Sequence, residues 1–303
     1  MRIAAFAAAA CLIVGGALCA AELQLTAVDD ATGEPVPVRV HLRDARGRTP
    51  KVDGTIAWND HFVMPGQTTL NLPPGKYTFE MERGPEYRLR TGTFELKRGD
   101  ADAREVRMVR IVDMRTEGWW SGDLHIHRAP EDIELLMLAE DLHVAPVITW
   151  WNDKNLWKGK PLPDAPLHQF DTDRFYHVMA GEDERGGGAL LYLNGRRPLD
   201  IAGAAREYPA LDVFLREAKK DPQVHVDLEK PFWWDAPTLA ATGLIDSIGL
   251  AHNHMQRSGV LDNEAWGRPR DKSIYRGPTG NGRWTTDIYY HLLNCGLRIP
   301  PSA

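Results

Sequence analysis

The hydrophobic periodicity of the chain changes near residue 112, and this change most limits the folds that the chain can adopt. Before this point, segments such as residues 23–28 and 36–42 alternate between apolar and polar residues, with turn-forming residues between them. After it, apolar strand-like segments alternate with segments of helical periodicity. The first pattern predicts a small all-β sandwich. The second predicts strands and helices that alternate around a parallel sheet or barrel.

The first region, residues 21–112, shows no grouping of residues with recognisable chemistry. Its two histidines, His41 and His61, are 20 positions apart and are interpreted as isolated. We therefore predict an accessory β-sandwich domain that acts as a spacer or docking domain and is dispensable for metal binding.

The second region, residues 113–303, is predicted to alternate strands and helices. Short apolar runs are typical of buried strands, whereas apolar residues three or four positions apart are typical of helices. The expected strands are residues 144–149, 176–180, 189–193, 224–228 and 245–250, and the expected helices are residues 130–140, 211–218 and 236–241. In such a fold the carboxyl ends of parallel strands form the edge at which sites are built.

The most informative motif is the segment GWWSGDLHIH at residues 118–127. If residues 123–127 form a strand, His125 and His127 point to the same side, because side chains alternate along a strand. Two adjacent imidazoles suit a divalent metal ion. Asp123 lies on the same predicted face, where it can orient an imidazole. The alternative is that both histidines lie on a solvated edge of the sheet.

Further polar residues follow the predicted strands at their carboxyl ends. Glu182 follows one strand, Glu229 and Lys230 follow another, and His254 follows a third. Because these ends meet at one edge of a parallel sheet, we expect the side chains to converge with His125 and His127. This placement predicts His125, His127, Glu182 and His254 as ligands of a divalent metal.

Residues 115–303 resemble the PHP (polymerase and histidinol phosphatase) metallohydrolases, and in particular the CehA/McbA-like branch. The resemblance lies in the phrases GDLHIH at 122–127, GE at 181–182, EKPFWWD at 229–235 and DSIGLAHNH at 246–254. The phrases GEPVPVRV and LPPGKY in the first region resemble carboxypeptidase-regulatory-like, immunoglobulin-type domains.

This resemblance implies a PHP-like distorted (β/α) barrel preceded by an immunoglobulin-like sandwich. It implies that one or two divalent ions (Zn, Mn or Fe) supply a bound hydroxide that hydrolyses an ester, carbamate or phosphoester. In this hypothesis, Asp123, Glu229 and Lys230 are the catalytic candidates, as orienting groups, general base or anion stabiliser.

The chain also departs from the family pattern. Trp150 and Trp151 stand where the family usually has Asp-His, Lys230 replaces the histidine of a His-Pro pair, and the closing Asp-x-His is absent before the chain ends at Ala303. These departures predict an incomplete metal cluster and a C-terminus that looks truncated.

An alternative function follows from the same departures. The chain has Trp pairs at 119–120, 150–151 and 233–234. In this alternative, a catalytically degenerate secreted protein binds glycan through tryptophans at the barrel rim, although core packing explains such residues equally well.

The ends of the chain and its composition limit its location and partners. Residues 1–20 have a positive start, an apolar core and small residues near Ala20, which predict a cleaved signal peptide and export to the periplasm or exterior. Beyond it Cys295 is the one remaining cysteine, interpreted as buried, so no internal disulfide is expected. The net charge of −6 argues against nucleic acid. We expect a small-molecule or glycan substrate and no stable membrane anchor.

Overall fold

The computed structural model describes residues 20–256, 259–260 and 269–302 of the chain. These residues belong to two compact units, Met1–Asp113 with Leu138–Glu140, and Met114–Met137 with Asp141–Ala303. Residues 1–19 of the predicted signal peptide lie outside the described part. None of the described helices has the length and apolar character needed to cross a membrane.

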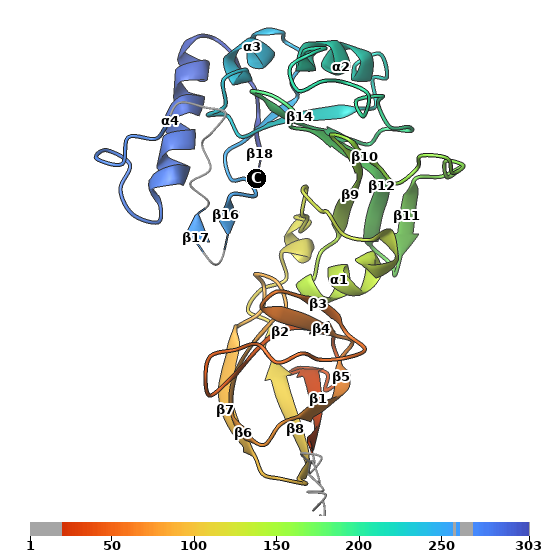
Figure 1. Ribbon diagram of the computed structural model, residues 1–303, viewed down its shortest axis with the longest axis vertical. Coiled ribbons are helices and arrows are strands. Elements are labelled where there is room, and N and C mark those ends of the chain that lie inside the picture. Colours follow the sequence, from red (N-terminus) through yellow and green to blue (C-terminus); the bar gives the residue numbers. More distant parts are fainter. Residues whose placement is uncertain (1–19, 257–258, 261–268, 303) are drawn as a thin grey trace, which may run out of the picture. The chain divides into compact units, whose positions relative to one another are not determined.

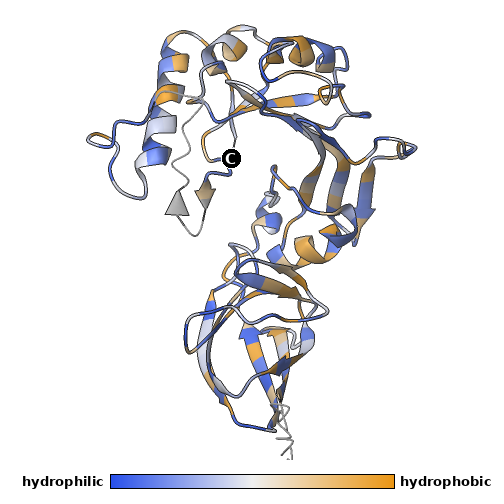
Figure 2. Cartoon of the chain, in the orientation of Figure 1, coloured by the Kyte–Doolittle hydropathy of each residue, from blue (hydrophilic) through white to orange (hydrophobic). Residues whose placement is uncertain are grey.

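Two β-sheets enclose the apolar core of the first unit. One has β1 (Ala21–Asp29) between β5 (Gln67–Leu72) and β8 (Ala101–Met108). The other has the order β3 (Ile56–Trp58), β4 (His61–Met64), β2 (Val38–Asp44), β6 (Gly75–Glu82) and β7 (Arg90–Leu96). Alternate residues such as Leu23 and Leu25 are buried, which follows from the period of two along a strand. Figure 2 shows this alternation of hydrophobic and hydrophilic residues along the strands.

A mixed sheet of eight strands organises the second unit. Its order is β10 (Lys154–Asn155), β9 (Val144–Trp151), β12 (Arg174–Asp183), β13 (Ala189–Leu193), β14 (His225–Glu229), β15 (Ser247–Gly249) and β18 (Pro301–Ser302), with β11 (Leu167–Phe170) also paired to β12. β12 is parallel to β9, β13 is antiparallel to both β12 and β14, and β15 is parallel to β14 and β18. A separate two-stranded ribbon joins β16 (Met255–Gln256) and β17 (Gly259–Val260).

The described residues hold four α-helices: α1 (Ile133–Glu140), α2 (Leu211–Ala218), α3 (Ala236–Ala241) and α4 (Gly280–Asn294). Two 3-10 helices cover Met114–Glu117 and Pro130–Asp132. In Figure 1, α2 and α3 lie along one side of the sheet that contains β14. Cys295 follows α4 and is exposed, so its predicted burial is wrong.

The register of the sheet determines which side chains lie on each of its two faces. Gly181 pairs with Trp150 and with Tyr192, and this row belongs to the apolar core that α2 and α3 cover. Glu182, one position further along β12, pairs with Trp151 and with Leu191 and therefore points to the opposite face. One face is consequently apolar and packed by helices, while the opposite face carries Glu182 beside a smaller apolar cluster that includes Ala180 and Leu191.

The predicted distorted (β/α) barrel is wrong, because no pairing among the described strands closes this sheet into a cylinder. Residues 184–188 alone join β12 to β13, whereas a crossover between parallel strands takes about a dozen residues or more. These two strands therefore form an antiparallel hairpin. Apolar runs identify buried strands but do not reveal their direction, which explains the error.

Gly181 lies under the indole ring of Trp150, which also stacks on Tyr192 with ring centroids 5.5 Å apart. A Cβ at residue 181 would approach Cε2 of Trp150 to 2.0 Å. We expect Gly181→Ala to lower the free energy of unfolding by about 1–3 kcal/mol through overpacking. Urea unfolding at neutral pH measures this change.

Gly203→Ala is the matched control, because a Cβ at this exposed position meets no atom within 4 Å. An equal unfolding midpoint for the two variants would show that Trp150 moves aside without cost and would contradict the packing described above.

Candidate functional site

The segment that carries His125 and His127 does not form the predicted strand. Gly122 and Ile126 make only isolated bridges, to Val144 and Val147 of the neighbouring strand β9. The backbone between these bridges is held in part by Asp123, whose carboxylate accepts a hydrogen bond from the His125 N–H at 2.9 Å. The two imidazoles nevertheless face each other, with Nε2 of His125 3.1 Å from Nε2 of His127.

The carboxylates of the site come from the polar face of the sheet. Glu182 is the second-last residue of β12, Asp227 lies in the middle of β14 and Glu229 ends it, and the antiparallel strand β13 lies between β12 and β14. Leu191 of β13 pairs with both Glu182 and Asp227, so these residues form one row across the sheet. Residues two positions apart on a strand share a face, which places Glu229 on the same side as Asp227.

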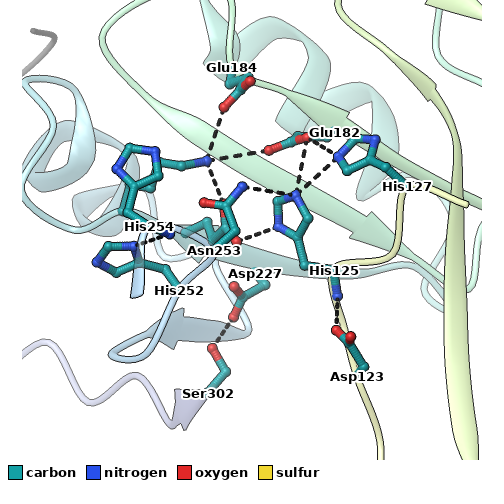
Figure 3. A network of polar contacts seen from close by, with 12 residues as sticks. Asp123, His125, His127, Glu182, Glu184, Asp227, His252, Asn253, His254 and Ser302 are labelled. Carbon is teal, nitrogen blue, oxygen red and sulfur yellow. Dashed lines mark hydrogen bonds and ion pairs between the residues drawn. The ribbon is translucent and has the colours of Figure 1, made fainter. Parts of the chain in front are cut away.

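His125, His127 and Glu182 bring three ligand atoms together, all within 4.8 Å of one another. Oε2 of Glu182 lies 2.9 Å from Nε2 of His127 and 3.5 Å from Nε2 of His125. Two donors bound to one tetrahedral ion at the usual ~2.0–2.1 Å are separated by roughly 3.3 Å. The three observed separations therefore fit the edges of a coordination polyhedron (Figure 3).

Glu229 fixes the tautomer of His125. Its Oε1 accepts a hydrogen bond from Nδ1 of His125, so the proton of a neutral His125 lies on Nδ1. Nε2 then has a lone pair directed toward His127 and Glu182, which is the arrangement of a carboxylate that orients a metal-binding histidine. Burial lowers the pKa of His125, but hydrogen bonds with Glu182 and Glu229 outweigh burial and raise it to about 10. The site thus favours a positive charge at this position.

Lys230 supplies the cation that holds the carboxylates together. Its side chain is fully buried, and its Nζ lies 2.6 Å from Glu229, 3.0 Å from Glu184 and 3.4 Å from Glu182. Burial alone lowers the pKa of Lys230, but these three carboxylates outweigh it and raise the pKa. The backbone of Lys230 has φ 52°, a conformation that is unusual for a residue other than glycine and often found at functional sites.

The protonation of the surrounding carboxylates depends on their partners. Burial raises the pKa of Glu182, but hydrogen bonds with His125 and His127 outweigh it, and the pKa falls well below its usual value. The pKa of Glu184 is raised, because burial and the nearby Glu182 outweigh the attraction of Lys230. Burial also raises the pKa of Asp123.

A cavity of about 370 Å³ borders the site on one side. Its lining includes Asp123, His125, Glu229 and Asn253, and Asp227 hydrogen-bonded to Ser302 lies beside them. The side-chain nitrogen of Asn253 is 3.3 Å from Nε2 of His125 (Figure 3). The site is therefore open to small molecules from this cavity.

His254, the fourth predicted ligand, lies in the same neighbourhood but outside the group of ligand atoms within 4.8 Å. Its ring lies 5.4 Å from that of His252 and 6.3 Å from that of Phe232. Burial and the charge of Lys230 lower the pKa of His254. Its buried Nδ1 has no hydrogen-bond partner within the described part of the chain. Metal binding by His254 stays a prediction.

The tryptophans of the three Trp pairs do not line one shared binding surface. Trp150 and Trp233 are buried, whereas Trp119, Trp120 and Trp234 are exposed. Trp151 contacts the site directly, because its ring lies edge-on to that of His127 at 4.7 Å. Packing thus accounts for two of these residues, and one supports a histidine of the site.

Sequence reasoning missed Glu184 and Asn253. Glu184 directly follows β12 and lies two positions after Glu182, and both carboxylates contact Nζ of Lys230, so the Glu-x-Glu spacing is the signal that could have identified it. Asn253 lies between two histidines in the phrase His252–His254, without a spacing that distinguishes it.

The chain matches no protein-family model and no curated protein. Solved structures that resemble parts of it include the TIE protein of Bacillus anthracis, with 20% identity and a TM-score of 0.24 over 36% of this chain and 19% of that chain. Another is GBS52, the minor pilin of Streptococcus agalactiae, with 19% identity and a TM-score of 0.26 over 32% of this chain and 47% of that chain. A third is BcpA, the major pilin subunit of Bacillus cereus, with 14% identity and a TM-score of 0.23 over 30% of each chain.

The chain spans between about a fifth and a half of the length of these structures. The predicted resemblance to PHP metallohydrolases of the CehA/McbA-like branch is wrong, because no family model matches and the described strands do not close into a barrel. The resemblance to carboxypeptidase-regulatory-like domains likewise has no matching model.

The predicted hydrolysis of an ester, carbamate or phosphoester rested on the PHP resemblance, so that prediction is wrong as well. The alternative of glycan binding at a barrel rim is also dropped, because the sheet of the described residues has no such rim.

Replacement of Lys230 tests the charge balance of the site. In Lys230→Met, three carboxylates lose their buried cation, and we expect the free energy of unfolding at pH 7 to fall by about 3–5 kcal/mol. Without Lys230 these carboxylates ionise less readily when folded, so their pKa values rise. A carboxyl group whose pKa is higher in the folded than in the unfolded state lowers the free energy of unfolding at neutral pH. This loss becomes smaller as the pH falls and the group is protonated in both states.

Urea unfolding in the presence of a chelator should therefore show a smaller loss of stability at pH 5 than at pH 7. Lys220→Met, which removes an exposed lysine paired with Glu217, is the control and should change little. A loss that does not depend on pH would show that packing, not charge, explains the role of Lys230.

Proposed function

We propose that the protein binds a divalent metal ion through Nε2 of His125, Nε2 of His127 and a carboxylate oxygen of Glu182. The observation that supports this most is the separation of the three ligand atoms, which are 2.9, 3.1 and 3.5 Å apart. These values match the spacing of donors around one ion. Glu229 orients His125 for this role, and Lys230 holds Glu229 and Glu182 in place.

The donor set determines which ions fit. Two imidazole nitrogens and one carboxylate oxygen suit Zn²⁺, Mn²⁺ or Fe²⁺, whereas the absence of thiolate from this donor set disfavours Cu⁺. Three protein ligands leave at least one coordination position for a molecule from solution. The cavity of about 370 Å³ beside His125 gives such a molecule access, and we propose a small molecule as the partner.

We further propose that the protein is exported. The charged start, the apolar run and the small residues before Ala21 support a signal peptide, and β1 of the first unit begins at Ala21.

The double variant His125→Ala/His127→Ala removes two of the three proposed ligands. We expect it to bind one ion fewer per chain than the wild type, because a single carboxylate does not hold a transition metal tightly. Chelator-treated protein is reloaded with Zn²⁺, freed of excess metal, and its metal content is measured by mass spectrometry.

The matched control is His168→Ala/His291→Ala, which removes two histidines outside the site. It should keep the metal content of the wild type. Circular dichroism of each variant shows whether the fold is retained. If the folded His125/His127 variant holds as much metal as the wild type, the proposed site does not exist.

The export proposal is tested by expression of the chain with residues 1–20 in a bacterium with a general secretory pathway. We expect the exported protein to begin at Ala21 or one residue later. N-terminal sequencing of that protein gives the answer, and an exported chain that still begins at Met1 would contradict cleavage.

A further inference from the structure

The first unit brings together two histidines that are 20 positions apart in the sequence. β2 and β4 are antiparallel neighbours, with Val40 opposite Phe62, so the next positions along them are His41 and His61. Residues directly opposite each other on such strands have side chains about 5 Å apart. The two imidazole rings indeed lie 5.2 Å apart and are tilted by 50°. The interpretation of these histidines as isolated is therefore wrong.

Asp60 lies between the two imidazoles. It belongs to the turn that joins β3 to β4, next to the pair formed by Trp58 and His61. One carboxylate oxygen lies 2.9 Å from Nδ1 of His61, and the other lies 3.3 Å from Nδ1 of His41. Each of these three side chains offers one ligand atom within 4.8 Å of the others.

We propose that His41, Asp60 and His61 form a second binding site for a divalent metal ion. Each imidazole nitrogen faces its own oxygen of Asp60, at 2.9 and 3.3 Å, and both separations are close to the roughly 3.3 Å expected between two donors on one tetrahedral ion. Two imidazoles and one carboxylate make this a site for a borderline ion such as Zn²⁺. The site does not depend on the one proposed in the second unit, because it shares no residue with it.

The surroundings of His41 support this role. Oε1 of Glu82 lies 4.0 Å from Nε2 of His41, on the nitrogen that does not face Asp60. At this distance the contact is electrostatic and not a hydrogen bond, and the attraction of Glu82 favours a proton on Nε2, which leaves the lone pair of Nδ1 for a metal. Glu82 is also paired with Arg39, so Asp60 is the carboxylate that supplies the charge facing the ion.

The side chains of the site differ in burial, so that the imidazoles are fixed while Asp60 is accessible from solvent. The side chain of His41 is 5% exposed and that of His61 is 15% exposed, whereas Asp60 is 42% exposed. The imidazoles are therefore held by the packed sheet, and an ion reaches them from the side of the turn.

The position of the site indicates that a bound ion stabilises the fold of the first unit. β3 is an edge strand, and three residue pairs join it to β4. A metal bound by His41 on one side and by Asp60 and His61 on the other links this hairpin to β2. Because the unfolded chain does not present the three ligands together, binding stabilises the folded unit.

The experiment uses the full chain and Zn²⁺ as the probe. Wild type, His61→Ala, Asp60→Asn and the His125→Ala/His127→Ala variant are stripped of metal and reloaded, and bound Zn²⁺ per chain is counted. We expect two ions for the wild type and one for each variant. Asp53→Asn, which removes an exposed carboxylate of the same unit paired with Lys51, should keep both ions.

A second measurement separates loss of the site from loss of the fold. Zn²⁺ should raise the thermal unfolding midpoint of the first unit in the wild type and in the His125/His127 variant. It should not raise this midpoint in Asp60→Asn, which keeps the size of the side chain. Co²⁺ replaces Zn²⁺ for an absorption spectrum that reports the ligand environment of each site.

The outcomes distinguish the two metal proposals. One ion in the wild type that is lost in the His125/His127 variant, with His61→Ala and Asp60→Asn unchanged, would overturn the second site and leave the first. One ion that is lost in His61→Ala and Asp60→Asn would support the second site and overturn the first. Two ions retained by both His61→Ala and Asp60→Asn would also overturn the second site.

Discussion

The fully buried ammonium of Lys230 is the interaction on which the second unit's polar face depends. Three carboxylates surround it, from Glu182 and Glu184 at the end of β12 and from Glu229 at the end of β14. Like charges at such distances repel strongly when buried, and without a cation between them they would protonate or separate. Lys230 therefore allows two strands that are not neighbours to present acidic side chains at one place, where His125 and His127 meet them.

Local periodicity predicted many elements of the second unit. The helices expected at residues 211–218 and 236–241 are α2 and α3, and the strand expected at residues 189–193 is β13. Polar residues at predicted strand ends also indicated Glu182 and Glu229, which contact His125 and His127, together with His254, which lies outside that group of ligand atoms. These predictions worked because both depend on short-range patterns, namely the period of side chains along an element and the point at which it ends.

The architecture was not predictable in the same way. Whether a buried strand runs parallel or antiparallel to its neighbour depends on its connection, and the short link at residues 184–188 permits only the antiparallel hairpin. The grouping of His41 with His61 was missed for a related reason, because it depends on the register between β2 and β4. Register is a property of two segments together, so the composition of each segment alone does not reveal it.

The alternation of polar and apolar positions along β12 limits how the length of this strand can change. Gly181 faces the helices and the stacked rings of Trp150 and Tyr192, while Glu182 faces Lys230. Insertion or deletion of one residue within the strand would exchange the two faces downstream, placing a carboxylate among apolar side chains and an apolar group beside the ammonium. An added residue can be absorbed as a bulge, and the pairing of β12 with β9 already shifts register between His177 and Gly181, which leaves Gly181 and Glu182 on their proper faces.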